Sequence, residues 1–352
     1  MKVTAFTRYD PRAASTRQRF VQYFPALREA GIEVEHLPLL GEDYVANLVT
    51  GEPYPVTRVA RAYAQRLGQL LTSRDSDLYW VYVELLPYIP ALLERLAAGG
   101  KRIIYDFDDA FFHTYDQSGN PLVRALLGGK HAAQLKRAAA CVCGNDYIER
   151  FAARYCDRTM VLPTVVDTEA YRPAAAAGSE ALTIGWIGSP TTWPGVRPIL
   201  PILEEICAQY RARFLVVGAG REAAREAFPA MVLRDWTEAT EIGDVQSMDV
   251  GIMPLLDRPF ERGKSGYKLI QYMACGLPAV ASPVGVNVQI VEDGVNGFLA
   301  STAQEWRDAL GSLLDSAQLR ARLGSAGRAR AVAEVSLDSQ KERLIALFKS
   351  FA

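Results

Sequence analysis

The stretch Asp257–Asn287, DRPFERGKSGYKLIQYMACGLPAVASPVGVN, restricts the fold of this 352-residue chain more than any other segment. It begins as a polar loop with glycine and three cations, and a Ser-Gly pair then precedes a predicted helix over Tyr267–Ala274. Gly276 just past this helix and Pro278 soon after it are typical helix-stop signals. The apolar segment Ala279–Ala281 predicts a buried strand.

The predicted helix has an apolar side and a polar side. Lys264, Lys268 and Gln271 follow helical spacing, so they lie in one row along the polar side. The N–H groups of the first turn have no acceptor within the helix, and the positive end of the helix dipole lies there. Ser265 is the predicted N-cap. These features predict an anion site, most naturally for a diphosphate, with an ordinary amphipathic helix and solvated lysines as the alternative.

The segment GKSGYKLIQYMACGLPAVASPVG resembles the donor-sugar signature of bacterial glycosyltransferases of family four. The resemblance implies the GT-B fold, an α/β architecture in which two Rossmann-like, doubly wound domains face each other across a cleft. It also implies that this loop and helix hold the diphosphate of a nucleotide sugar. The family pattern is E-x7-E, and here Gly263 and Gln271 occupy the two acidic positions. The amide of Gln271 can still bond a ribose hydroxyl.

The resemblance also indicates which residues would bind the donor. Ser189 stands where the family has a phosphate-binding arginine, in a loop that follows the predicted strand Leu182–Ile187. The charge of the phosphates is therefore expected to be met mainly by the two lysines of the helix. The predicted donor-binding residues are Ser189, Lys264, Ser265, Gly266, Tyr267, Lys268 and Gln271.

In the N-terminal half, a predicted strand over Arg102–Tyr105 runs into Asp106, Asp108 and Asp109, with His113 beyond. Carboxylates at the end of a buried strand are costly unless something uses them. A D-x-D pattern is one way to hold Mg²⁺ or Mn²⁺ beside phosphates, which would point to the single-domain GT-A fold. The diphosphate site in the other half argues against that interpretation, and we predict no metal and no cofactor.

The family carries a polar catalytic-site residue, often histidine, at the corresponding strand end. Counting along the strand places Asp108 at this position, with Asp106 and Asp109 as neighbours and His113 as a candidate helper. Orientation of the acceptor hydroxyl and stabilisation of an oxocarbenium-like centre are both open as roles. A structural role is the alternative for the lone histidine.

The rest of the N-terminal half predicts a β-loop-α-β start, with strands near Lys2–Thr7 and Ile32–Leu37 and a helix over Arg17–Ala30. The resemblance implies that the loop before that helix lies near the donor phosphates and acceptor. Residues 41–55 look irregular. A basic amphipathic helix over Thr57–Leu71 could rest on an anionic membrane, but we favour a solvated face.

A second glycine pattern, Gly218-Ala219-Gly220-Arg221-Glu222-Ala223, follows a predicted strand. It resembles the dinucleotide fingerprint but lacks its third glycine, so we interpret it as a tight strand-to-helix turn and not as an NAD site.

Composition excludes several classes of protein. With 49% hydrophobic and 22% charged residues the chain is a globular protein, and its net charge of −1 argues against a nucleic-acid partner. Five scattered cysteines indicate a reduced, cytoplasmic protein. The N-terminus does not have the pattern of a signal peptide, and no apolar run reaches the length of a membrane span.

We therefore expect three parts: a Rossmann-like acceptor domain over residues 1–168, a donor domain over 169–336, and a C-terminal helix over 337–352 that returns to the first. Asp167–Ser179 is the expected linker. The expected function is a metal-independent, retaining transfer of a sugar from a UDP- or GDP-sugar to a glycan or glycolipid, in cell-envelope polysaccharide assembly at the inner face of the membrane. A sugar-nucleotide epimerase and a catalytically idle nucleotide-binding module are the alternatives.

Overall fold

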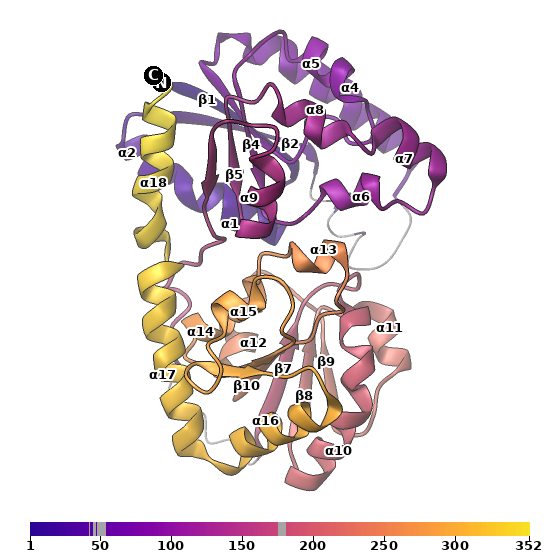
Figure 1. The fold of residues 1–352 in the computed structure, drawn as a ribbon, viewed down its shortest axis with the longest axis vertical. Helices are drawn as coiled ribbons and strands as arrows, with labels where there is room; N and C mark the ends of the chain where they lie inside the picture. Colours follow the sequence, from indigo (N-terminus) through magenta and orange to yellow (C-terminus); the bar gives the residue numbers. More distant parts are fainter. Residues whose placement is uncertain (42, 45–46, 48–53, 175–180) are drawn as a thin grey trace.

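The computed structural model describes residues 1–41, 43–44, 47, 54–174 and 181–352. Two parallel six-stranded sheets, one in each half of the chain, form the centres of two domains that face each other (Figure 1). Apolar strand residues and the helices that cover both faces of each sheet form the cores. This arrangement confirms the predicted α/β class with two doubly wound domains.

The strands are short and mostly buried on both faces, as parallel strands covered by helices require. The first sheet consists of β1 (Lys2–Tyr9), β2 (Glu33–Leu40), β3 (Leu78–Tyr82), β4 (Ile103–Phe107), β5 (Ala140–Cys143) and β6 (Thr159–Val161). The second consists of β7 (Thr183–Ile187), β8 (Arg213–Val217), β9 (Met231–Arg234), β10 (Val250–Met253), β11 (Ala279–Ala281) and β12 (Gly297–Leu299).

Helices connect the strands. Those of the first domain are α1 (Ala14–Arg19), α2 (Phe24–Glu29), α4 (Val56–Thr72), α5 (Ala91–Ala97), α6 (Phe112–Asp116), α7 (Pro121–Leu127), α8 (Lys130–Leu135) and α9 (Asp146–Ala152). The second half contains α10 (Leu200–Tyr210), α11 (Gly220–Arg225), α12 (Glu241–Gln246), α13 (Pro259–Arg262), α14 (Tyr267–Ala274), α15 (Asn287–Ile290), α16 (Ala303–Asp315), α17 (Ala317–Glu334) and α18 (Leu337–Lys349).

The strand order places a switch point in each sheet. The orders are β2-β1-β3-β4-β5-β6 and β12-β11-β10-β7-β8-β9. Successive strands are therefore added on one side of β1 and then on the other, and likewise around β7, so the switch points lie between β1 and β3 and between β7 and β10. Ligands of open parallel sheets bind beyond the carboxyl ends of the strands at such points. The carboxyl ends of both sheets point toward the space between the domains (Figure 1).

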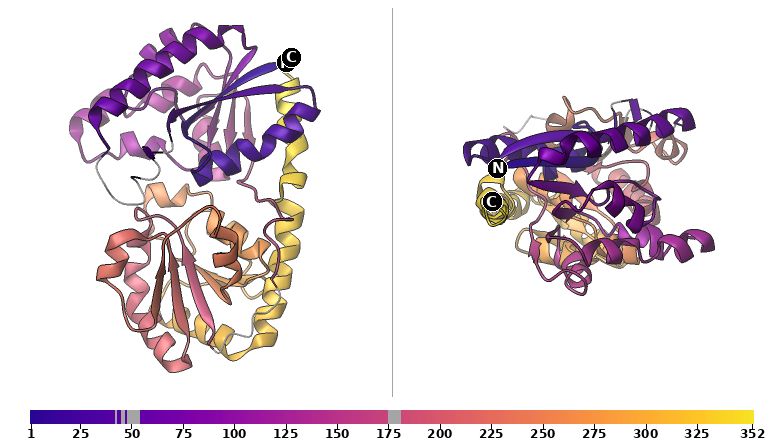
Figure 2. Two further views of the ribbon diagram at one scale, coloured as in Figure 1. Left: turned by 180° about the vertical axis from the view of Figure 1, so that it is seen from behind. Right: turned by 90° about the horizontal axis from the view of Figure 1, so that it is seen from above.

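The last two helices connect the domains. Helix α17 packs on α14 in the second domain, and α18 continues along the first domain, where Phe348 meets the ring of Trp80 edge-on. Both chain ends therefore lie together at the far end of the first domain (Figure 2). The predicted linker crosses residues 175–179, which lie outside the described residues, as does most of the irregular segment predicted at 41–55.

Some element predictions are wrong in detail. The helix predicted over 17–30 is broken into α1 and α2, with Phe20 between them in a non-helical conformation. After β3 the next helix, α5, begins only at Ala91, because Pro87 and Pro90 interrupt the segment between them. By contrast, the predictions of a helix over Tyr267–Ala274 and a strand over Ala279–Ala281 are confirmed residue by residue.

The basic amphipathic helix predicted at 57–71 is part of α4, but not all of its arginines lie on the solvated face that we predicted. Arg66 is buried, donates a hydrogen bond to the carbonyl of Thr7 (2.8 Å), and lies over the ring of Phe6. Burial lowers the pKa of this guanidinium to about 9. Among the described helices, none combines the length and apolar character needed to cross a bilayer.

Candidate active site between the domains

A cavity of about 300 Å³ lies between the two domains, beyond the carboxyl ends of β7 and β8 and beside the start of α14. The first domain contributes the backbone around the start of α1, and the second contributes most of the wall. The lining residues with polar or aromatic side chains are Arg12, Ser189, Trp236, Glu241, Tyr267, Lys268 and Gln271. Four of the seven predicted donor-binding residues are therefore in this wall: Ser189, Tyr267, Lys268 and Gln271.

Lys268 is the cation that the second domain contributes to this wall. Its ammonium lies 5.5 Å from the ring centroid of Trp186, a residue of β7 that is otherwise in the core. Burial, and then repulsion from Lys264, lowers the pKa of Lys268 to about 7, against the opposing attraction of Asp109. A half-buried ammonium without a bound counter-anion is expected to titrate in this range.

Lys264 and the amides before α14 form the edge of the site nearest the first domain. The Lys264 ammonium lies 5.4 Å from the ring centroid of Phe260, and the residue is not in the cavity wall. The N-cap of α14 is Gly266, with φ +70°, so the prediction that Ser265 caps the helix is wrong. Instead the Ser265 N–H donates to Oδ1 of Asp109 at 2.9 Å. One N–H group of the predicted anion site is thus already bonded to a carboxylate of the first domain.

Gln271 is buried and its amide is used within the protein. Nε2 donates to Oε1 of Glu241 at 2.8 Å and lies 3.4 Å from the hydroxyl of Tyr171. The carboxylate of Glu241 also accepts from Nε1 of Trp236 (2.9 Å) and from Nη2 of Arg17 (2.8 Å), which comes from the first domain. Glu241 is 3% exposed and faces the cavity. Sequence analysis missed it because it lies 30 positions from Gln271 in a segment with several acids.

The cavity wall beyond Lys268 is formed by the loops that follow β7, β8 and β9. Ser189 is exposed and its hydroxyl bonds that of Thr191 at 2.8 Å. Gly218 has φ +79°, and a Cβ there would lie 2.3 Å from the carbonyl oxygen of Gly188. The glycines after β8 therefore allow two loops to touch, as the predicted tight turn requires. Trp236 lies between Arg17 and the cavity.

The three carboxylates at the end of β4, Asp106 within the strand and Asp108 and Asp109 after it, have different surroundings. Asp106 is fully buried and accepts two hydrogen bonds from Arg19, at 2.9 and 2.7 Å. Asp108 accepts from the hydroxyl of Tyr82 at 2.8 Å; burial, and then repulsion from Asp109, raises its pKa to about 7. Asp109 is the one of the three that touches the other domain, at Ser265. Asp109 is therefore closest to the predicted donor site.

His113 lies in α6 with both ring nitrogens engaged. Nδ1 lies 2.8 Å from a carboxylate oxygen of Asp116, and Nε2 lies 2.9 Å from the hydroxyl of Tyr147. Tyr147 in turn lies against Gly263 of the second domain. His113 thus holds Tyr147, which touches the second domain, and it does not line the cavity.

Close contact between the two domains explains why a glycine, Gly263, stands at the first acidic position of the family pattern. A Cβ on Gly263 would lie 2.3 Å from Cβ of Ala110 in the first domain. The backbone carbonyls of Gly263 and Lys264 accept from Nδ2 of Asn145, at 3.0 and 3.1 Å. A side chain at 263 is therefore incompatible with this approach of the two domains.

We expect Gly263→Ala to separate the domains at this contact. Small-angle scattering should show a larger radius of gyration, because the added methyl group cannot fit against Ala110. Gly68→Ala, in the middle of α4 with open space around it, is the matched control and should leave the radius unchanged. Equal radii for the two variants would contradict this account of Gly263.

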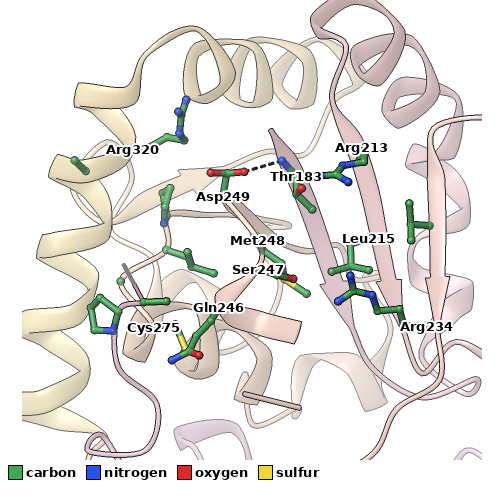
Figure 3. A pocket seen from close by; sticks show the side chains of 17 residues that line it. Thr183, Arg213, Leu215, Arg234, Gln246, Ser247, Met248, Asp249, Cys275 and Arg320 are labelled. Atoms are coloured by element: carbon green, nitrogen blue, oxygen red, sulfur yellow. Dashed lines mark hydrogen bonds between the residues drawn. The ribbon is translucent and has the colours of Figure 1, made fainter. Parts of the chain in front are cut away.

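A larger cavity, of about 570 Å³, lies at the opposite ends of the second sheet (Figure 3). Its wall includes Thr183 and Arg213 at the amino ends of β7 and β8, and Asp249 just before β10. Oδ2 of Asp249 accepts the N–H of Thr183 at 2.7 Å, which joins two strand starts. Ligands of parallel sheets bind at the other ends, so we assign the site to the smaller cavity.

Within the part of the chain that the structure describes, no three His, Cys, Asp or Glu side chains gather in a way that could hold a metal ion. Metal independence stays a prediction.

Comparison with known families and proteins identifies what the chain resembles. Residues 181–316 match the family model described as "Glycosyl transferases group 1", and the match includes the whole segment 257–287. The chain is 28% identical over 200 residues to a D-inositol 3-phosphate glycosyltransferase of Xylanimonas cellulosilytica. The aligned stretch is 49% of this chain and 47% of the relative, so the chain spans about half the length of that curated protein. The predicted resemblance is thereby confirmed.

Solved structures resemble the chain over nearly its whole length. Sucrose-phosphate synthase from Thermosynechococcus elongatus has a TM-score of 0.76 at 15% identity, with 99% of each chain covered. HepE from Anabaena, solved in complex with UDP, has a TM-score of 0.71 at 14% identity, with 99% of this chain and 100% of HepE covered. At these identities the likeness shows the fold, which is the predicted GT-B architecture.

Proposed function

From the match to group 1 glycosyl transferases, we propose that this chain transfers a sugar from a UDP- or GDP-sugar to a glycan or glycolipid acceptor. The observation that carries the proposal is the interdomain cavity with Lys268 in its wall at the start of α14. The UDP complex of HepE, a protein of the same fold, supports a nucleotide donor. We further propose that the reaction retains the anomeric configuration, needs no metal, and serves polysaccharide assembly at the inner face of the membrane.

In this proposal the second domain binds the donor. Lys268 and the first amides of α14 (Ser265, Gly266 and Tyr267) meet the diphosphate, where the largest charge develops as the donor bond breaks. Lys264 adds positive potential from the edge of the site. Gln271 and Glu241 together bond the ribose hydroxyls, since one offers an amide and the other a carboxylate. Trp236 and Ser189 form the wall on the far side of the cavity.

In the same proposal, the first domain contacts the transferred sugar and the acceptor. The bond between the anomeric carbon and the diphosphate oxygen breaks, and the nucleoside diphosphate leaves with the electron pair. A new bond forms between the anomeric carbon and the acceptor oxygen, and the proton of the acceptor hydroxyl passes to the departing diphosphate oxygen. Asp109 and Asp108 are the carboxylates nearest this step. Orientation of the hydroxyl and stabilisation of positive charge on the sugar are both open to them. Asp109 must exchange its bond with Ser265 for one to substrate when phosphate arrives.

A thermal-shift panel tests donor binding. UDP or GDP should raise the melting temperature in the presence of EDTA, and NAD should not. Failure of every nucleotide to stabilise the protein would contradict the proposal. Turnover of a UDP-sugar without an acceptor would instead favour an epimerase, and binding without turnover on a broad acceptor panel would favour an idle nucleotide-binding module.

The pKa of Lys268 predicts that donor binding depends on pH. The ligand-free pKa is about 7, lowered first by burial and then by Lys264. A diphosphate favours the charged form, so binding is strongest below this pKa and weakens as pH rises through it. Each pH unit above the pKa should cost a factor of about ten in UDP affinity.

Titration calorimetry at several pH values, in buffers of different ionisation enthalpy, measures both the affinity and the proton uptake. Lys268→Arg provides the control, because arginine stays charged throughout this range and its variant should lose the slope. Affinity that is flat in the wild-type protein between about pH 7 and pH 9 would contradict the assignment.

A further inference from the structure

The carboxylate of Glu241, the first residue of α12, accepts hydrogen bonds from four side chains. Oε1 accepts from the hydroxyl of Tyr171 and from Nε2 of Gln271, the latter at 2.8 Å. Oε2 accepts from Nη2 of Arg17 at 2.8 Å and from Nε1 of Trp236 at 2.9 Å. A carboxylate has about four lone-pair positions, two on each oxygen, so these donors fill it. A ribose hydroxyl can therefore donate to Glu241 only when one of them leaves.

Three of the four donors move with the second domain. Trp236 and Gln271 belong to that domain, and Tyr171 lies in the segment between β6 and β7. The carbonyl oxygen of Tyr171 accepts from Nη1 of Arg328 at 2.6 Å. The same nitrogen donates to the carbonyl of Ala274, the last residue of α14, at 2.7 Å. Tyr171 is thus attached to α14 at its backbone as well as at its hydroxyl.

Arg17 is the donor that belongs to the first domain. It lies in α1, and its side chain is 13% exposed. Other acceptors are within its reach. Nη1 already donates to the carbonyl of Arg12 at 2.7 Å, and Nε lies 3.7 Å from Oε1 of Glu238, whose side chain is exposed. Arg17 can therefore leave Glu241 without becoming an unpaired charge.

We propose that the ion pair of Arg17 with Glu241 is an interdomain latch, which the ribose hydroxyls of the donor displace. The inference rests on the proposed function, in which Glu241 bonds the ribose, and adds a control on donor entry. In the donor-free protein the latch ties α1 to α12. When a ribose hydroxyl takes the position on Oε2, Arg17 turns to Glu238 and the first domain loses this hold. Donor binding and release of the domain contact are then one event.

The phosphate end of the site has a contact of the same kind. Asp109 of the first domain accepts the N–H of Ser265, one of the amides proposed to meet the diphosphate. Each first-domain side chain has the hydrogen-bonding character of the ligand group that it precedes. A carboxylate accepts hydrogen bonds as phosphate does, and a guanidinium donates them as a hydroxyl does. Both ends of the site therefore support displacement as the route of donor entry.

Nucleotide and nucleoside binding by Arg17→Met tests the latch. Calorimetry measures UDP, ligand-observed NMR measures uridine, and GDP with guanosine is titrated in parallel. Removal of the competing guanidinium should tighten binding of nucleotide and nucleoside alike by about tenfold, roughly the value of one charge-assisted hydrogen bond. The two factors should be equal, because the ribose is common to both ligands. If Arg17 instead bound the diphosphate, the variant would bind the nucleotide more weakly and the nucleoside unchanged.

Arg28→Met, which removes an exposed charge from α2, is the matched control and should bind as the wild-type protein does. Arg17→Gln keeps a neutral hydrogen-bond donor and should give a smaller gain in the same direction. Thermal melts followed by circular dichroism show that each variant is folded. Unchanged or weaker nucleotide binding by both Arg17 variants, with a wild-type protein that binds, would overturn the latch alone. Failure of the wild-type protein and the variants to bind any nucleotide would overturn the proposed function together with it.

Discussion

Replacing Lys268 by methionine is expected to remove the UDP-dependent rise in melting temperature and to lower turnover by a factor of about 10²–10³. The ammonium is the cation of the cavity wall at the start of α14, and methionine keeps most of the side-chain length without the charge. A group that neutralises a leaving diphosphate acts most strongly when the bond breaks, so the loss should appear in turnover as well as in binding.

Lys264→Met is the matched comparison. Lys264 lies four positions earlier, over the ring of Phe260, and outside the cavity wall. Its removal should weaken UDP binding by less than the Lys268 change, through loss of positive potential alone. Turnover by purified protein with radiolabelled UDP-sugars measures both variants. A larger loss for Lys264→Met than for Lys268→Met would contradict the geometry of the site.

Replacing Arg19 by methionine is expected to lower the free energy of unfolding by about 3–5 kcal/mol, the usual cost of leaving one member of a buried ion pair uncompensated. Arg19 and Asp106 are 1% and 0% exposed, and Arg19 also donates to the carbonyl of Leu162 at 2.6 Å. The other carboxylate oxygen of Asp106 accepts from Nε1 of Trp80 at 3.2 Å. The pair thus joins α1 to the centre of the first sheet.

Urea unfolding followed by circular dichroism measures this cost. The double variant Arg19→Met with Asp106→Leu should recover most of the lost stability, because no charge is then left buried. A cost below about 1 kcal/mol, as for a surface ion pair, would contradict the structural account. Turnover of the folded double variant tests the catalytic role predicted for Asp106: retained turnover would show that Asp106 has a structural role alone, and lost turnover would support the prediction.

The sequence predicted the second half of the chain better than the first. Helix α14 and strand β11 lie where the pattern indicated because glycine and proline mark their ends, and both signals act through local backbone geometry. In the first half, the helix predicted over 17–30 is instead divided at Phe20. The buried contacts of Glu84 and Glu94 with Lys130 also join residues far apart in the first half, and no local rule indicates them.

Some residues of the candidate site could be predicted from the sequence and others could not. Lys268 and Gln271 could be found because they share one side of one helix, where spacing and family resemblance both apply. Glu241 and Arg17 could not be found, since their ion pair at 2.8 Å joins residues 224 positions apart in different domains. The placement of Asp106 in the core and of Asp109 at Ser265 likewise depends on which way each side chain leaves the end of β4.

The amino-acid sequence by itself determined the local features of this protein: its parallel-sheet pattern, the glycine-bounded start of α14 and the row of polar residues along that helix. These follow from backbone preferences and periodicity within a few neighbouring residues. Only the tertiary structure decided that Lys268 lines a cavity, that Glu241 meets Gln271 there, and that Gly263 must lack a side chain. Those outcomes depend on the approach of two domains, and contact between distant residues is set by packing of the whole chain.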